Sequence, residues 1–149
     1  MAAADGVLVY APSLDEIARR WKEIEPLLRR ATDRSSGAYE TIDVLRQVLN
    51  QQLGLWLVTN HDFAVAVAVT EIVNHPRKRV LTIRFIGGHG MRQWYRQLFD
   101  CFDNQARQAC CEVIVAEGRK GWGRTSLFGF DPVNVTFQRQ VPPIPLIGD

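Results

Sequence analysis

A strand, a glycine-rich segment and a helix follow one another directly in the middle of the chain, and this succession restricts the fold more than any other feature. Residues 80–86 (VLTIRFI) are mostly apolar and partly β-branched, as in a buried strand. Residues 87–90 (GGHG) lead into 91–109, where apolar side chains recur at helical spacing. Residues 112–116 (EVIVA) predict the next strand. Because a helix connects the two strands, they are expected to be parallel.

The segments before this unit predict an antiparallel meander. Residues 55–59 and 63–73 are strand-like, and Asn60-His61-Asp62 between them predicts a hairpin turn. The turn 74–78 (NHPRK) leads on to the central strand. In residues 64–70 (AVAVAVT) small alanines alternate with valines. This alternation predicts that a helix or a neighbouring backbone closely covers one face of the strand.

The N-terminal part predicts one strand and two helices. Residues 6–10 (GVLVY) form the strand, and Ser13 can cap the first helix, with Glu16 completing a capping box. Pro26 predicts a kink or a restart within this helix. Residues 41–53 predict the second helix. The apolar positions at helical spacing are Ile17, Trp21, Ile24 and Leu28 in the first helix and Leu45, Val48, Leu49 and Leu53 in the second.

The C-terminal part predicts a short helix over 121–128 and a last strand over 133–141. Residues 142–149 (PPIPLIGD) contain prolines that suit neither a helix interior nor a central strand. This tail is expected either to pack on its own domain or to become ordered on a partner. We therefore expect one domain over 1–141 with an α/β (α+β) fold, in which helices flank a mixed, mostly antiparallel sheet, followed by the tail 142–149.

The overall composition argues against several classes of protein. The net charge of +2, from 18 basic and 16 acidic residues, does not indicate the basic face of a nucleic-acid binder. Cys101, Cys110 and Cys111 form no C-x-x-C pair, and no two histidines have ligand spacing, so no metal site is expected. This cysteine pattern is typical of the reducing cytoplasm. No signal-peptide pattern begins the chain, and the longest apolar run, 63–69, is too short to span a bilayer.

The glycine-rich segment is the strongest candidate for a binding site. Glycines between a strand and a helix let backbone N–H groups approach a ligand closely, and the helix N-terminus adds unsatisfied donors and a partial positive charge. A pyrophosphate suits such a site, and Arg92 can add a full charge. The alternative is that the glycines only form a tight turn.

This order of elements resembles the GNAT (N-acetyltransferase-like) fold, in which the loop after the fourth strand binds the pyrophosphate of acyl-CoA. In the family pattern Arg/Gln-x-x-Gly-x-Gly/Ala, the two glycines correspond to Gly88 and Gly90, and the first position falls on Phe85. Arg84 is one residue away, and strand alternation places it on the opposite face. The resemblance implies a single GNAT-like domain. If the protein is an enzyme, the resemblance implies acetyl-CoA as the cofactor, bound by Gly87, Gly88, His89, Gly90, Met91 and Arg92.

Acetyl transfer to an amine requires a base, and the candidates are Glu71, Glu112 and Glu117, of which Glu71 and Glu117 are favoured near the strand ends. The alternative for Glu71 is an ion pair with Arg77, Lys78 or Arg84, and for Glu117 an ion pair with Arg119 or Arg124. His89 can contact a phosphate or remain solvated. Many GNAT enzymes carry a tyrosine as general acid in the short helix, where this chain has only Thr125, Ser126, Leu127 and Phe128.

The chain is more closely similar to small GNAT-like proteins encoded among the morphogenesis genes of tailed phages. The shared features, over about residues 55–140, are Thr70-Glu71-Ile72, Pro76-Arg77-Lys78, the segment from Gly87 to Trp94, and 118–124 (GRKGWGR). The resemblance implies a virion structural or assembly protein, associated with the head, portal vertex or tail, that resides in the host cytoplasm and then in the virion. The alternative is an active, cytoplasmic acetyl-CoA-dependent N-acetyltransferase.

The phage resemblance also implies partners. Other phage structural proteins are the expected partners, contacted in part through the tail 142–149, and the chain can also form a homo-oligomer. Trp122, between Gly121 and Gly123, is expected to be a partner contact, a plug in the cleft between the central strands, or a ligand platform.

Overall fold

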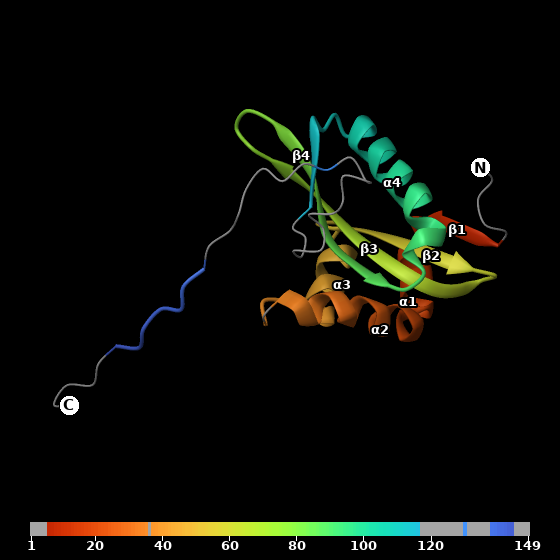
Figure 1. Cartoon of the computed structure of the whole chain (residues 1–149), viewed down its shortest axis with the longest axis horizontal. Helices are drawn as coiled ribbons and strands as arrows, with labels where there is room; N and C mark the ends of the chain where they lie inside the picture. Colours follow the sequence, from red (N-terminus) through yellow and green to blue (C-terminus); the bar gives the residue numbers. More distant parts are fainter. Residues whose placement is uncertain (1–5, 36, 117–129, 131–137, 145–149) are drawn as a thin grey trace. The chain divides into compact units, whose positions relative to one another are not determined.

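The computed structural model of the protein describes residues 6–35, 37–116, 130 and 138–144. The chain divides into two units, Met1–Glu117 and Gly118–Asp149, and the first unit carries every helix and strand described below (Figure 1). The predicted helix 121–128 lies outside the described residues. The described end of the predicted strand 133–141, residues 138–141, is not in a strand. The predicted boundary after residue 141 stays a prediction.

The sheet of the first unit has five strands in the order of the chain. Neighbouring strands are antiparallel except for β4 and β5, which are parallel because the helix α4 connects them. The predicted mixed, mostly antiparallel sheet flanked by helices is therefore confirmed. The strands are β1 (Val7–Tyr10), β2 (Gly54–Asn60), β3 (Phe63–Asn74), β4 (Arg79–Gly88) and β5 (Val113–Ala116).

Helices cover both faces of this sheet (Figure 1). One face carries α4, and the other carries α1, α2 and α3, with a short 3-10 helix (Asp33–Ser35) after α2. Ala66, Ala68 and Thr70 alternate along β3, and the Thr70 hydroxyl donates to Gln105 Oε1 of α4. The alanine face of β3 is thus covered by a helix, as the sequence predicts. The helices are α1 (Leu14–Arg19), α2 (Trp21–Thr32), α3 (Thr41–Leu49) and α4 (Met91–Gln108).

The helical segment restarts at Arg20 and not at Pro26, so the predicted restart at Pro26 was wrong, whereas the alternative, a kink there, stays a prediction. Arg20 leaves the helical region (φ −97°, ψ 8°), and its Nη1 donates to the carbonyl of Asp62 at 2.9 Å. This contact with the β2–β3 turn fixes the point where α1 ends and α2 begins. Pro26 lies inside α2, where its fixed φ is compatible with a helix.

The second helix is shorter than predicted, and its predicted buried side is confirmed at Val48 and Leu53 but not at Leu49. It ends at Leu49 because Gln51 adopts φ +61°, and Gln52 N–H then donates to Gln47 O at 2.8 Å. Val44 and Val48 are its buried residues, whereas Leu49 is 45% exposed. Apolar residues lie on more than one side of this helix, so the sequence alone does not show which side packs against the sheet.

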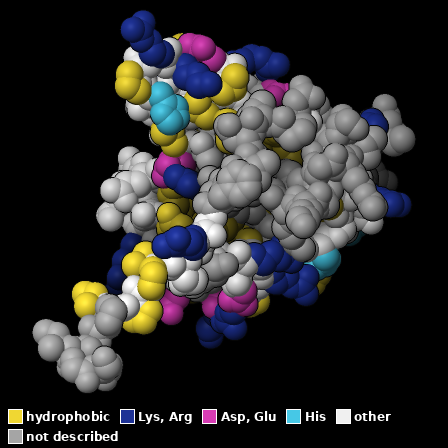
Figure 2. All heavy atoms as spheres, turned by 60° about the vertical axis from the view of Figure 1, so that its left-hand side comes forward, with side chains coloured by type: hydrophobic (Ala, Val, Ile, Leu, Met, Phe, Trp, Pro, Cys, Tyr) yellow, Lys and Arg dark blue, Asp and Glu magenta, His cyan; other side chains and the backbone are white. Residues whose placement is uncertain are grey.

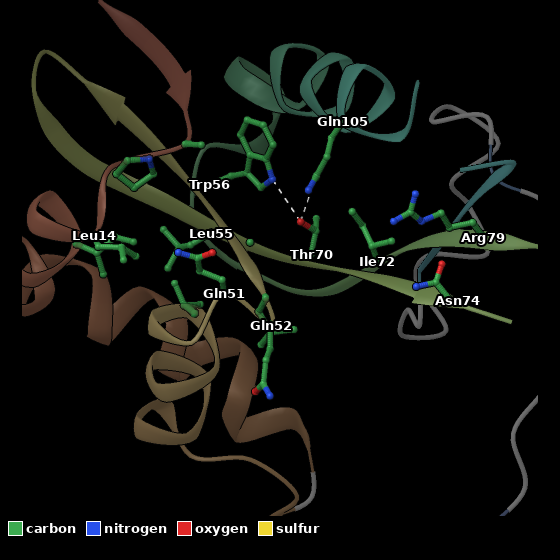
Figure 3. A pocket seen from close by; sticks show the side chains of 16 residues that line it. Leu14, Gln51, Gln52, Leu55, Trp56, Thr70, Ile72, Asn74, Arg79 and Gln105 are labelled. Atoms are coloured by element: carbon green, nitrogen blue, oxygen red, sulfur yellow. Dashed lines mark hydrogen bonds between the residues drawn. The ribbon is translucent and has the colours of Figure 1, made fainter. Parts of the chain in front are cut away.

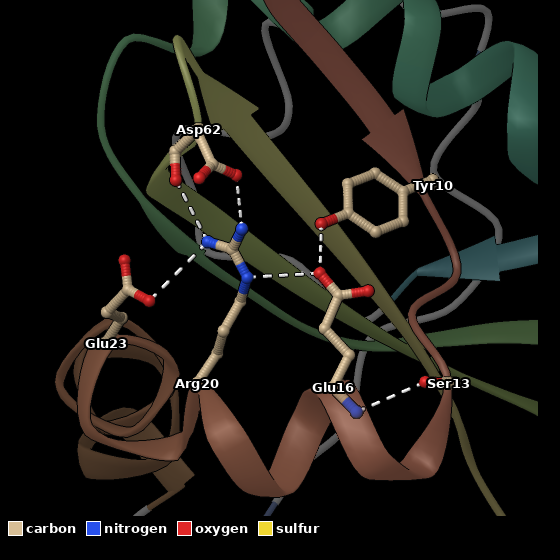
Figure 4. A network of polar contacts seen from close by, with 6 residues as sticks. All are labelled: Tyr10, Ser13, Glu16, Arg20, Glu23 and Asp62. Carbon is tan, nitrogen blue, oxygen red and sulfur yellow. Dashed lines mark hydrogen bonds and ion pairs between the residues drawn. The ribbon is translucent and has the colours of Figure 1, made fainter.

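A polar network joins α1 to the start of the sheet (Figure 4). Tyr10 donates to Glu16 Oε2, and Arg20 Nε lies 3.1 Å from the same carboxylate oxygen. Arg20 also contacts the carboxylate of Asp62. Burial, followed by the hydrogen bond to Glu16, raises the pKa of Tyr10 to about 12. The network therefore holds Tyr10 in its neutral form.

This raised pKa predicts a loss of stability in alkali. A folded-state pKa above the unfolded value of about 10 stabilises the protein fully below that pH, and the contribution is lost as the pH rises through about 12. The melting temperature of the wild type is expected to fall more between pH 10 and 12 than that of Tyr10→Phe. Melting curves of both proteins across this range measure the difference, and parallel curves would contradict the assigned cause.

Candidate functional site

The residues predicted to bind an anion lie at the junction between β4 and α4, with one change of boundary. Gly87 and Gly88 belong to β4, where they pair with Val67 and Ala66 of β3. The prediction that all of residues 87–90 form a loop was therefore wrong. Only His89 and Gly90 connect the strand to the helix.

Close packing explains the two strand glycines. A Cβ atom on Gly87 would lie 2.0 Å from the carbonyl oxygen of Leu27 in α2. A Cβ atom on Gly88 would lie 2.4 Å from Val65 O, and Gly88 also has a φ of +141°. Neither position admits a side chain without moving backbone. The absence of side chains here brings α2 and β3 close to β4 and is not by itself a sign of ligand binding.

The two-residue loop is held from both sides and leads into α4. His89 N–H donates to Val65 O at 3.1 Å, and His89 O accepts from Trp94 Nε1 at 2.9 Å. Gly90 adopts the left-handed conformation (φ 74°, ψ 29°) as the N-cap of α4. The backbone N–H groups of Gly90, Met91 and Arg92 have no backbone acceptor among the described residues. These three amides are the part of the predicted site that remains available to an anion.

The ladder between the two parallel strands is described only for the first part of β4. It runs from Val80 opposite Val113 to Ile83 opposite Ala116. Beyond Ile83, β4 continues to Gly88 and pairs with β3 only, within the described part of the chain. The two strands are paired up to Ala116, the last described residue of β5, and a divergence beyond it stays a prediction. The N-terminus of α4 follows the far end of β4.

A bulge at Arg84 overturns the predicted alternation of Arg84 and Phe85. Val69 pairs with Phe85 and Thr70 with Ile83, so Arg84 is the extra residue of β4. Phe85 packs against the core on the α2 face, where its ring lies 5.4 Å from that of Tyr39. Arg84 donates to a carboxylate on the same face. Both side chains therefore project from one side of the sheet.

That carboxylate belongs to Glu71, the first predicted base. Arg84 Nη2 lies 2.7 Å from Glu71 Oε1, and the two side chains are 30% and 27% exposed. The ion pair given as the alternative role of Glu71 is present, and its role as a base stays a prediction. The second predicted base, Glu117, and the aromatic residue Trp122 lie outside the described residues.

Other reactive groups of the described residues do not assemble into a site. Burial, with a smaller contribution from Asp100, raises the pKa of the Cys101 thiol, which opposes its use as a nucleophile. Cys110 and Cys111 are also free thiols. The described ranges contain no group of His, Cys, Asp and Glu side chains that could hold a metal ion. No described helix is both long and apolar enough to cross a membrane.

Sequence reasoning missed a pocket at the opposite end of the sheet (Figure 3). It has a volume of about 470 Å³ and is lined by five segments of the chain: residues 11–17, residues 48–56, the end of β3, the start of β4 and α4. Its members are far apart in the sequence, and no motif marks them. Figure 2 shows one face of the molecule, on which the described basic side chains lie in separate groups near acidic ones.

Comparisons with known proteins identify the fold. No protein-family model and no curated sequence matches the chain. Solved structures do match. A GNAT family acetyltransferase from Staphylococcus aureus has a TM-score of 0.64 and 10% identity, covering 91% of this chain and 99% of that one. An aminoglycoside acetyltransferase from an uncultured soil metagenomic sample, in complex with trehalose, has a TM-score of 0.67 and 8% identity, covering 93% and 98%.

A third solved structure was determined with acetyl-CoA. It is a predicted acetyltransferase from Clostridium acetobutylicum, with a TM-score of 0.63 and 14% identity, covering 90% of this chain and 96% of that chain. Identities this low show a shared fold and do not transfer an activity. In all three cases nearly the whole of the other protein is matched. The chain has the fold of the GNAT-family acetyltransferases.

Proposed function

We propose that the protein binds acetyl-CoA at the N-terminus of α4 and transfers the acetyl group to an amine. One observation carries this proposal. The amides of Gly90, Met91 and Arg92 lack backbone acceptors among the described residues, and they begin the helix that follows β4. Several solved structures with this fold are acetyltransferases, and one was determined with acetyl-CoA.

The residues at this terminus fit a pyrophosphate. Gly90 is exposed, and an added Cβ atom would approach no neighbour more closely than the 3.6 Å to Gln93 Oε1, so there is room above the N-cap. The first turn of α4 contains no acidic side chain, whereas those of α1, α2 and α3 each contain at least one. The helix dipole and the exposed Arg92 both favour a negative group there.

Within this proposal, the chain's own groups orient the acceptor and accept a proton. Bound acetyl-CoA supplies an acetyl group activated as a thioester. The attacking amine must lose a proton, and Glu71 and Glu117 remain the proposed acceptors. Arg84 fixes the Glu71 carboxylate through Oε1. A carboxylate held in this way is oriented but retains a second oxygen for a proton or a water.

The charge of Arg92 provides a test that leaves the fold intact. Arg92→Glu is expected to weaken acetyl-CoA binding about tenfold to a hundredfold, because it replaces an attraction to phosphate by a repulsion. The melting temperature is expected to stay level or rise slightly, because an acidic residue in the first turn favours the helix. Calorimetric titration with acetyl-CoA measures the affinity.

Arg77→Glu is the matched control, because it makes the same change of charge in the exposed β3–β4 turn. It is expected to leave the affinity within about twofold of the wild type. Equal weakening by both substitutions would mean that only net charge matters. Unchanged binding in Arg92→Glu would place any acetyl-CoA site elsewhere.

A second candidate function is a phage structural or assembly role on the same scaffold. The observation that favours it is the structural use of the expected site. Gly87, Gly88 and the His89 amide all serve packing or strand contacts, and Glu71 is in an ion pair. Trp122 and the tail 142–149 would then contact other virion proteins or a second copy of the chain.

The two candidates lead to different locations. A structural protein would pass from the host cytoplasm into the particle, and an antibody against the chain would detect it in purified virions at a fixed ratio to the capsid protein. An enzyme would remain in the cytoplasm. Detection in virions together with no acetyl-CoA binding would favour the structural role and overturn the first proposal.

A further inference from the structure

The pocket at the end of the sheet where β2 and β4 begin and β3 ends has one apolar wall and one polar wall (Figure 3). Its volume of about 470 Å³ lies within the range of small-molecule sites in proteins. The apolar wall consists of side chains from α1, α3 and β2. The residues are Leu14, Ile17, Val48, Leu53 and Leu55, and Leu14 is 41% exposed at the edge of the pocket.

The polar wall is built from β3 and α4 and is fixed by hydrogen bonds. The Thr70 side chain is buried, with 1% exposure, and its hydroxyl accepts from Trp56 Nε1 at 3.4 Å and donates to Gln105 Oε1 at 3.1 Å. Ile72 and Asn74 continue this row along β3 toward Arg79 at the start of β4 (Figure 3). The wall therefore changes from hydroxyl and amide groups to a cation along its length.

Gly54 joins the two walls. A Cβ atom there would lie 3.1 Å from Thr70 Oγ1 and 3.6 Å from Gln105 Nε2. Because Gly54 has no side chain, the pocket passes around the first residue of β2 from the apolar wall to the polar wall. A ligand that follows this path needs an apolar part and a polar end.

The charge of the lining residues indicates which polar group the ligand carries. Arg79 is the charged side chain among the lining residues, and none of these residues is acidic. Its Nη1 donates to Ala109 O at 2.7 Å, which holds the guanidinium beside the C-terminal end of α4. A guanidinium carries five donors in a planar fork that matches a carboxylate. Asn74, opposite Arg79 in the β3–β4 register, offers an amide next to it.

We infer that this pocket binds a linear amphipathic carboxylic acid of the medium-chain fatty acid class. The carboxylate lies at Arg79 and Asn74, and the hydrocarbon chain passes Ile72 and Gly54 toward Leu14 and Leu55. The inference is independent of the proposed acetyl-CoA site, because Arg79 begins β4 whereas the acetyl-CoA site follows the last residue of that strand.

The test is a calorimetric titration of the full chain with sodium decanoate below its micelle concentration. The wild type is expected to bind one equivalent. Arg79→Gln is expected to weaken decanoate binding about tenfold, because a charge-assisted hydrogen bond is lost. Arg77→Gln, an exposed substitution in the same hairpin turn that does not line the pocket, is expected to bind as the wild type does. Decanol, which lacks the charge, is expected to bind Arg79→Gln and the wild type equally.

A second variant and a second measurement locate the ligand. Leu14→Gln changes the apolar wall at an exposed position and is expected to weaken decanoate and decanol by the same factor. Backbone amide shifts are expected at Gly54 and Thr70 and not at Gly90 to Arg92. Absence of saturable binding would overturn the inference, as would equal decanoate affinity in Arg79→Gln and the wild type. Shifts confined to the start of α4 would also overturn it, and they would leave the proposed anion site standing.

Discussion

Replacing Gly87 with alanine is expected to lower the free energy of unfolding by about 3 kcal/mol or more, the upper range for an added core methyl group. The new Cβ atom would lie 2.0 Å from Leu27 O and 3.0 Å from Leu27 C. Both atoms belong to the backbone of α2, so no side-chain rotation relieves the overlap. The helix must move away from β4, which loosens the core around Leu27 and Ala31.

Gly37→Ala separates this clash from the effect of removing a glycine. Unlike Gly87, Gly37 has a positive φ, +82°, and nothing lies within 4 Å of an added Cβ atom. Its cost is therefore limited to backbone strain, about 1–2 kcal/mol. Chemical denaturation of both variants gives the comparison. A Gly87→Ala variant as stable as Gly37→Ala would show that α2 does not pack on β4 as closely as described.

Replacing Phe102 with alanine is expected to cost about 3–5 kcal/mol, as is usual for a buried phenylalanine. Phe102 is a fully buried residue of α4. Its ring makes edge contacts with those of Trp56 and Phe99 at centroid distances of 6.3 and 5.4 Å. Its loss leaves a cavity between α4 and the sheet. The melting temperature is expected to fall by roughly 10 °C.

Phe63→Ala is the control for this second prediction. Phe63 begins β3 and is 73% exposed, so the same truncation there removes little packing. Its effect is expected to stay within about 0.5 kcal/mol. Thermal melting measures both variants. Similar losses in the two would contradict the assignment of Phe102 to the packed side of α4.

The order of elements could be predicted because each depends on local patterning. The turn predicted over residues 60–62, the alternation in 64–70 and the helical spacing after residue 90 are all visible in the sequence. The parallel pairing of β4 and β5 then follows from a connection rule. The mixed sheet with helices on both faces is therefore largely determined by short-range signals.

The element boundaries that were predicted wrongly depend on contacts between residues that are distant in the sequence. Gly87 and Gly88 resemble a loop in the sequence, because the contacts that require glycine come from Leu27 and Val65. The helix break at Arg20 depends in the same way on Asp62. Neither partner can be assigned before the fold is known.

The junction between strand and helix that carries the candidate site could be predicted, whereas the end of the strand and the bulge within it could not. The junction of β4 and α4 was found because a helix N-terminus after a strand is a local feature. The bulge that brings Arg84 to the face of Phe85 adds a residue to one strand only, and no sequence pattern announces it. The pocket around Gly54 and Thr70 was missed because five segments of the chain contribute to it.

The proposed binding of acetyl-CoA at the N-terminus of α4 can be tested by NMR. The amide chemical shifts of the ¹⁵N-labelled full chain are followed during a titration with acetyl-CoA. We expect saturable shifts that are largest at Gly90, Met91 and Arg92, the residues whose N–H groups lack backbone acceptors among the described residues. Shifts that do not saturate, or saturable shifts that leave these three amides unchanged, would contradict it.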